Sequence, residues 1–231
     1  MKKTNRIKYI IDVIMSVCLL FVMAYQVTGD KYHEWFGVGM LLLFLVHNIL
    51  NLKWYQCLLK GKYNFRRIVW TVTNLAALGA VLITGYSGMA MSRYVFSSLD
   101  ISTGVLAVRS LHLAGSYWTF VLMSCHLGIH WGMIVGILLE KTNRNKLLLW
   151  GFRAAAFAFA SYGAVCVYHH DIYSYMFLKN QFAFMDYEKA AVFVLLEHAA
   201  MMGTFVYVVY YLMRVLKVLT SKKKDLYKAH V

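Results

Sequence analysis

Long apolar stretches alternate along this chain with short polar segments that are mostly basic. A helix needs about 20 apolar residues to cross a hydrocarbon core of about 30 Å. Six stretches meet this length: Tyr9 to Val27, His33 to Leu59, Ile68 to Met91, Val105 to Leu139, Leu147 to Tyr168, and Ala190 to Val218. Backbone groups in a bilayer must bond within their own segment, which favours helices, and the two-residue alternation of a membrane barrel is not visible. We therefore predict an all-α integral membrane bundle of six transmembrane helices.

The first apolar stretch has the outline of a secretory signal, because it follows the basic residues Lys2, Lys3, Arg6 and Lys8. Its apolar part is longer than an ordinary signal core, and no A-x-A-like cleavage site follows it. We expect this stretch to remain in the protein as an uncleaved first span.

The formal net charge of +14 raises nucleic acid as a partner, so the position of the charge matters more than its total. Basic residues gather before span one, between spans two and three, between spans four and five, and after span six. The opposite side of the predicted bundle holds fewer of them: Lys31, Arg93, Lys179 and Lys189, with Arg109 just inside span four. By the positive-inside rule, both termini are cytoplasmic. The distribution of charge thus indicates how the chain is oriented in a bacterial cytoplasmic membrane. It favours lipid, and not nucleic acid, as the partner of the chain.

Two pairs of histidines repeat one spacing inside the predicted helices. His33 and His47 are 14 residues apart, as are His112 and His126, and no other histidine pair in the chain has this separation. On a helix, this spacing puts both members on one face, about 21 Å apart along the axis. The offset between the pairs is also constant, since 112 − 33 = 79 and 126 − 47 = 79. Because spans two and four run in the same direction, we expect His33 level with His112 and His47 level with His126.

Two neutral imidazoles facing each other are good axial ligands for haem iron. They give a six-coordinate iron that changes oxidation state without taking a substrate, which indicates an electron carrier. The four cysteines form no C-x-x-C or C-x-x-C-H motif, so covalent haem attachment is not expected. We predict two non-covalent b-type haems, one at each level, with His33, His112, His47 and His126 as the iron ligands. The open alternative is that these polar side chains only bond between membrane helices.

The same residues resemble the flavinylation-associated membrane cytochromes, a family long catalogued as a domain of unknown function. The resemblance covers roughly residues 5 to 140. It is carried by Thr28-Gly29, His33-Glu34-Trp35 with Gly37, His47 with Asn51 and Trp54, Thr84-Gly85, Ser87-Gly88, His112, and His126-Leu-Gly-Ile-His130-Trp131. It implies b-haem binding in a four-helix cytochrome b-like core, and passage of electrons from membrane quinol to flavins on exported proteins. We expect residues 1–140 to form this haem-binding domain, and residues 141–231 to add two more helices and a basic cytoplasmic tail.

Several other residues stay open as contributors. His130 lies one helical turn after His126 and is the alternative to it as iron ligand, although its offset from His47 is 83. As a neighbour of the haem it would suit a propionate or quinone contact. Arg109 lies one turn before His112, where it could clamp a haem propionate or simply extend to the membrane interface. Glu34 and Asp12 are candidates for orienting the ligands or carrying protons, because ionisable groups in spans are costly.

The second half of the chain carries weaker signals. Glu197 and His198 in span six are candidates for quinol deprotonation or a further metal contact, but they point about 100° apart around a helix. His169 and His170 lie in a predicted outer loop and are expected to be solvated.

The sequence therefore predicts a di-haem electron carrier between the membrane quinol pool and an extracytoplasmic flavoprotein or other redox partner. It need not catalyse bond-making, and quinol oxidation would be coupled electron and proton transfer. Two alternatives remain: the membrane-anchor cytochrome subunit of a dehydrogenase or reductase complex, and a histidine-lined transporter of metal ions or protons. The direction of electron flow, the acceptor, the quinone type and the oligomeric state are not given by the sequence.

Overall fold

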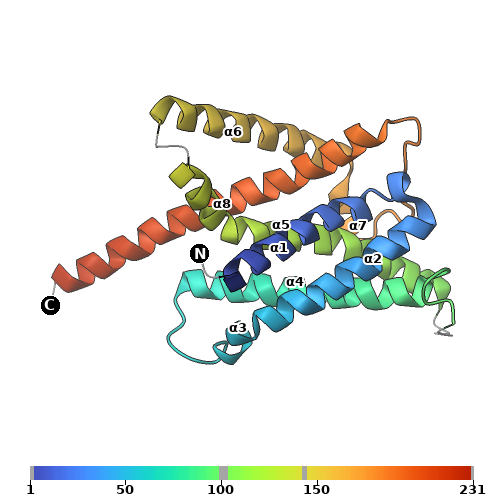
Figure 1. Cartoon of the computed structure of the whole chain (residues 1–231), viewed down its shortest axis with the longest axis horizontal. Coiled ribbons are helices and arrows are strands. Elements are labelled where there is room, and N and C mark those ends of the chain that lie inside the picture. Colours follow the sequence, from blue (N-terminus) through green and yellow to red (C-terminus); the bar gives the residue numbers. More distant parts are fainter. Residues whose placement is uncertain (1–2, 99–103, 142–144, 230–231) are drawn as a thin grey trace.

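The computed structural model describes residues 3–98, 104–141 and 145–229, and within these ranges it is helical and contains no strands (Figure 1). Its helices are α1 (Lys3–Met23), α2 (Tyr25–Leu50), α3 (Leu52–Gln56), α4 (Phe65–Met91), α5 (Val105–Lys141), α6 (Lys146–His169), α7 (Ile172–Met176) and α8 (Ala191–Ala229). The all-α prediction is confirmed for the described residues.

Five of these helices are long and apolar enough to cross a bilayer. The spanning segments are Tyr25–Leu50, Phe65–Met91, Leu106–Gly136, Lys146–His169 and Ala191–Thr220. They correspond to the second through sixth predicted spans. The multi-pass membrane class is therefore supported by five helices, while α1, the predicted first span, is not among them.

The boundaries of the first two predicted spans are wrong. The first stretch was expected to continue to Val27, but α1 ends at Met23 and the chain reverses beside the buried Ala24. Gly29 has φ 61° and ψ 177°, a left-handed backbone region that side chains disfavour, and this breaks the start of α2. The second stretch was expected to reach Leu59, but α2 ends at Leu50 and α3 follows as a separate short helix.

Successive long helices run in opposite directions (Figure 1). The start of α1, the far end of α8, α3 and the start of α4 lie at one end of the molecule, and α7 and the α4–α5 connection lie at the other. Helix α4 packs along α5, α8 lies between α5 and α6, and α1 packs along α2. Because α4 returns the chain between them, α2 and α5 run in the same direction.

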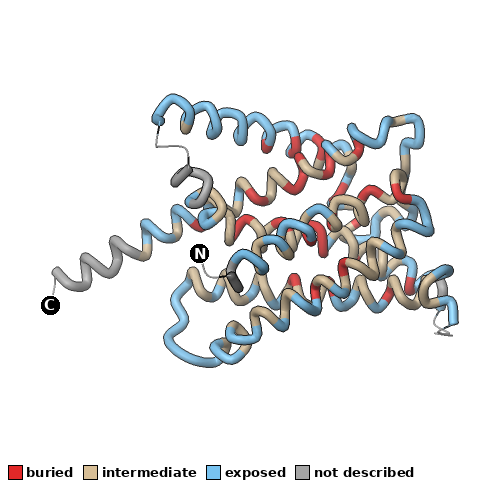
Figure 2. Tube along the Cα trace, viewed as in Figure 1, coloured by how far each residue is buried: buried red, intermediate tan, exposed pale blue. Residues whose placement is uncertain are grey.

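Buried side chains concentrate where α1, α5, α6 and α8 meet, whereas the first half of α6 is exposed along its length (Figure 2). Glycines allow the closest contacts there. A Cβ added at Gly163 of α6 would lie 1.9 Å from the Ala200 carbonyl oxygen of α8, and one at Gly128 of α5 would lie 2.9 Å from the Val206 carbonyl oxygen. Gly128, two residues after His126, therefore serves helix packing.

Candidate functional site

The four spaced histidines meet as two couples between α2 and α5. The ring centres of His33 and His112 are 6.1 Å apart, with their planes at 81°. Those of His47 and His126 are 6.2 Å apart, with planes at 78°. The structure thus brings the rings together in the level pairs that the shared offset indicates. What each pair can bind depends on the distance between its two rings and on the contacts of the second nitrogen of each ring.

The separation matches that of two imidazoles with one metal ion between them. A nitrogen–metal distance of about 2 Å on each side, with each ring centre about 1 Å beyond its nitrogen, gives about 6 Å between ring centres. Edge-to-face ring contacts without a metal also have centres about 4.5–7 Å apart, so the separation admits a bridging metal ion but does not require one. Among the described residues, no group of three or more histidine, cysteine or acidic side chains is placed to hold a metal ion.

The backbones of α2 and α5 stand apart where the rings face each other. Helix α2 packs closely along α1, but it approaches α4 only in places and α5 still less. Directly packed helices have axes about 8–10 Å apart. The two couples therefore reach across a wider separation than direct helix packing gives, which is the arrangement that a flat cofactor requires.

Three of the four rings have a partner for Nδ1, which fixes their orientation. His47 Nδ1 lies 2.8 Å from Asp12 Oδ1 on α1, and His126 Nδ1 lies 2.9 Å from Asn74 Oδ1 on α4. His112 Nδ1 lies 3.2 Å from both the Thr84 carbonyl oxygen and Ser87 Oγ on α4. Such contacts select the tautomer that leaves Nε2 free for a metal. The His47 Nε2 atom also has a long 3.4 Å contact with the Asn51 amide nitrogen.

Two buried side-chain nitrogens in the described part of the chain have no hydrogen-bond partner: His33 Nδ1 and Trp70 Nε1. Unpaired buried donors are costly and call for an explanation. His33 is itself a member of a couple, and the Val22 backbone lies near its ring. Trp70 lies against His130 with ring centres 5.4 Å apart, and His130 lies 4.9 Å from His126. Both unpaired nitrogens therefore adjoin the couples.

His130 is thus a neighbour of the His47–His126 couple. Arg66 contacts Trp70, with its Cζ 5.4 Å from the ring centre. Arg66, Trp70 and His130 thus follow one another toward His126, a row of nitrogen donors suited to an anionic group. Sequence reasoning named only His130 of these three.

Two residues expected near the His33–His112 couple have other contacts. Arg109 is exposed, and its Cζ lies 5.0 Å from the Phe182 ring centre, in the segment before α8. Glu34 accepts hydrogen bonds from Ser92 Oγ at 2.6 Å and from the backbone nitrogens of Arg93, Tyr94 and Val95 at 2.7, 3.0 and 3.1 Å. Glu34 therefore ties α2 to the end of α4 and anchors the α4–α5 connection.

A second polar cluster lies at the start of α8. The buried Glu197 contacts His170 Nε2 at 3.0 Å and pairs with Lys189, while His198 Nδ1 lies 2.8 Å from the Val194 carbonyl oxygen. The His170 and His198 ring centres are 5.6 Å apart. The His170 side chain is 35% exposed, so it is partly solvated as expected, and it also pairs with a buried carboxylate from another helix. The residues next to His170 in the sequence do not indicate that Glu197 is its partner, because the two are 27 residues apart.

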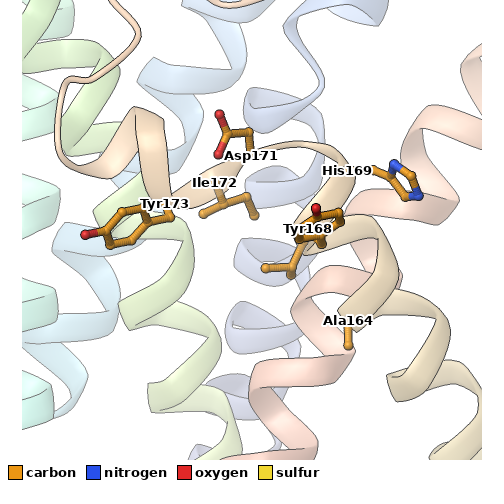
Figure 3. A pocket seen from close by; sticks show the side chains of 7 residues that line it. Ala164, Tyr168, His169, Asp171, Ile172 and Tyr173 are labelled. Atoms are coloured by element: carbon orange, nitrogen blue, oxygen red, sulfur yellow. The ribbon is translucent and has the colours of Figure 1, made fainter.

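A surface hollow lies at the junction of α6 and α7, away from both couples (Figure 3). Its volume is about 510 Å³, and it is lined by Ala164, Val167, Tyr168, His169, Asp171, Ile172 and Tyr173. The His169 and Tyr173 rings lie at opposite sides of this hollow in Figure 3. His169 is exposed, as expected, and Asp171 holds a left-handed backbone conformation at the turn into α7.

No protein-family model, curated protein or solved structure gives a significant match to this chain.

Proposed function

We propose that the chain is a b-type di-haem membrane cytochrome that carries electrons between the membrane quinol pool and an extracytoplasmic flavin-bearing or other redox partner. The observation that supports this most is the pair of couples, at 6.1 and 6.2 Å, reaching across two parallel helices that do not pack directly. One such couple would be explained by ordinary packing. Two at matching separations, on the same two helices, fit two cofactors held in line across a membrane.

In this proposal His33 and His112 hold one haem, and His47 and His126 hold the other. Two imidazole ligands supply a low-spin, six-coordinate iron that exchanges one electron and offers no open position to oxygen. The chain's own residues orient the ligands: Asp12 and Asn74 fix His47 and His126, while Thr84 and Ser87 fix His112.

All four rings are partly buried by the surrounding helices. We propose that α1 is a sixth span, because its 21 residues give a length of about 31 Å and because it supplies Asp12 to a couple. We also propose that the end of the molecule holding both termini is cytoplasmic, because basic residues gather there. The His33–His112 couple then lies toward the outer face.

The direct test is a dithionite-reduced minus oxidised spectrum of the purified full-length protein, with haem quantified per chain. We expect b-type bands and two haems. Protein expressed with sufficient haem that purifies colourless would refute the proposal. That result would favour a transporter, whereas recovery of the chain only together with a soluble redox subunit would favour a membrane-anchor role.

Replacement of single histidines tests the ligand assignment. We expect His112→Ala to leave one haem per chain, because only one couple is broken. His169→Ala is the matched control, since His169 is exposed at the α6–α7 hollow, and it should retain both haems. Retention of two haems by His112→Ala would contradict the assignment.

A further inference from the structure

The two couples differ in the charge of the groups that contact their ring nitrogens. His47 Nδ1 lies 2.8 Å from a carboxylate oxygen, that of Asp12. The contacts of His126 and His112 are uncharged, since they come from the Asn74 amide, the Thr84 carbonyl and the Ser87 hydroxyl. Only one of the four candidate ligands therefore contacts an acidic side chain through its ring.

We propose that Asp12 lowers the reduction potential of the His47–His126 centre below that of the His33–His112 centre, and so sets the direction of electron flow toward the latter. This inference rests on the proposed function. A carboxylate bonded to Nδ1 draws the proton toward itself and makes the ligand more basic, which stabilises the ferric state over the ferrous one. An electron then leaves the His47–His126 centre, which is oxidised, and reduces the His33–His112 centre, with no bond made or broken.

The carboxylates near the other couple do not act in the same way. Glu34 follows His33 directly in the sequence, but its oxygens accept four hydrogen bonds from Ser92 and the following backbone. Asp30 lies 3.8 Å from the Arg93 guanidinium and is bonded by the Tyr25 hydroxyl. Both carboxylates act on His33 through space, but neither bonds to its ring, and both are partly balanced by these other partners.

Cations near Asp12 weaken its effect without reversing it. Lys8, one turn earlier on α1, donates to Asn51 Oδ1 at 2.9 Å, and the Asp12 side chain is 41% exposed. Arg66 is separated from His126 by Trp70 and His130. Since Coulomb interactions fall with distance, the carboxylate in direct contact with the ligand has the largest influence.

Redox titration of the purified haem-loaded protein tests the inference through midpoint potentials. We expect two components, the lower of which disappears in His126→Ala. In Asp12→Asn the midpoint potential of that component should rise by at least about 59 mV. For a one-electron couple, this shift is a tenfold change in the reduction equilibrium. The higher component is the internal control and should move much less. Asp12→Glu, which keeps the carboxylate, should stay near the wild type.

A reciprocal variant gives a shift of opposite sign. Asn74→Asp places a carboxylate on His126 Nδ1 and should lower the same component further, so it carries the test if Asp12→Asn does not retain its haem. The inference is overturned if both haems are bound and neither variant shifts that component, or if the lower potential belongs to the His33–His112 centre. A wild-type protein without haem would instead overturn the proposed function itself.

Discussion

His126 and His130 differ in what each ring faces. The His126 ring faces His47 across the space between α2 and α5, and its other nitrogen is held by Asn74. The His130 ring lies one turn further along α5, against Trp70 and the edge of His126. A single turn of helix therefore separates a candidate iron ligand from a residue suited to contacting the cofactor's edge.

This difference predicts unequal effects of two matched substitutions. His126→Ala should reduce the haem content from two per chain to one, because it breaks a couple. His130→Ala should retain both haems and change only the potential or the band position of one. Haem quantification with reduced spectra measures this directly, and the opposite pattern would make His130 the ligand.

The couples could be predicted from the sequence because both members of each pair obey helical spacing and one shared offset. Their orienting partners could not. Asp12 is 35 residues from His47 and Asn74 is 52 from His126, and each lies on a different helix from its partner. Neither separation follows any periodicity. The contact between His170 and Glu197, 27 residues apart, was missed for the same reason.

The helices themselves were easier to predict than the turns between them. The five spanning helices follow from apolar length, because a bilayer sets that length. The reversal at Ala24 comes before the first polar residues of its turn, and the break after Leu50 is marked only by isolated polar residues such as Asn51 and Lys53. The backbone of α4 lies close to the His112 ring of α5. At one position of α4, this closeness restricts which side chain can fit.

That position is Gly88, where an added Cβ would lie 3.1 Å from His112 Cε1. Overpacking of this kind costs about 1–3 kcal/mol. Gly88→Val should therefore weaken haem binding at the His33–His112 couple by about tenfold or more, since each 1.4 kcal/mol is about tenfold in affinity. Haem content during stepwise dilution or competition with a haem acceptor measures the change.

Gly79→Val is the control on the same helix, because a Cβ at Gly79 meets nothing within 4 Å. It should bind both haems as the wild type does. Equal loss in the two variants would mean that α4 tolerates no side chain at either position, and that the contact with His112 is not the cause.

The start of α1 and the far end of α8 lie at the same end of the molecule, where α3 also lies (Figure 1). Of the four cysteines, only Cys57 is exposed, and it lies at the end of α3, on the side proposed to be cytoplasmic. An impermeant maleimide should therefore label the wild-type protein in inverted membranes but not in intact cells.

Cys57→Ser combined with Ser97→Cys moves the exposed thiol to the segment after α4, at the opposite end, because Ser97 is also exposed. This variant should be labelled in intact cells. Labelling of Cys57 from outside would invert the topology, and with it the side of the membrane to which the His33–His112 couple is assigned.

The central claim is that each couple holds one iron between two imidazoles. Electron paramagnetic resonance of the oxidised protein tests it most directly, because the spectrum reports both the axial ligands and the angle between their planes. With planes at 81° and 78°, we predict strongly anisotropic low-spin ferric signals of the large-g type, integrating to two haems per chain. A high-spin ferric signal, or no ferric haem signal, would contradict the account.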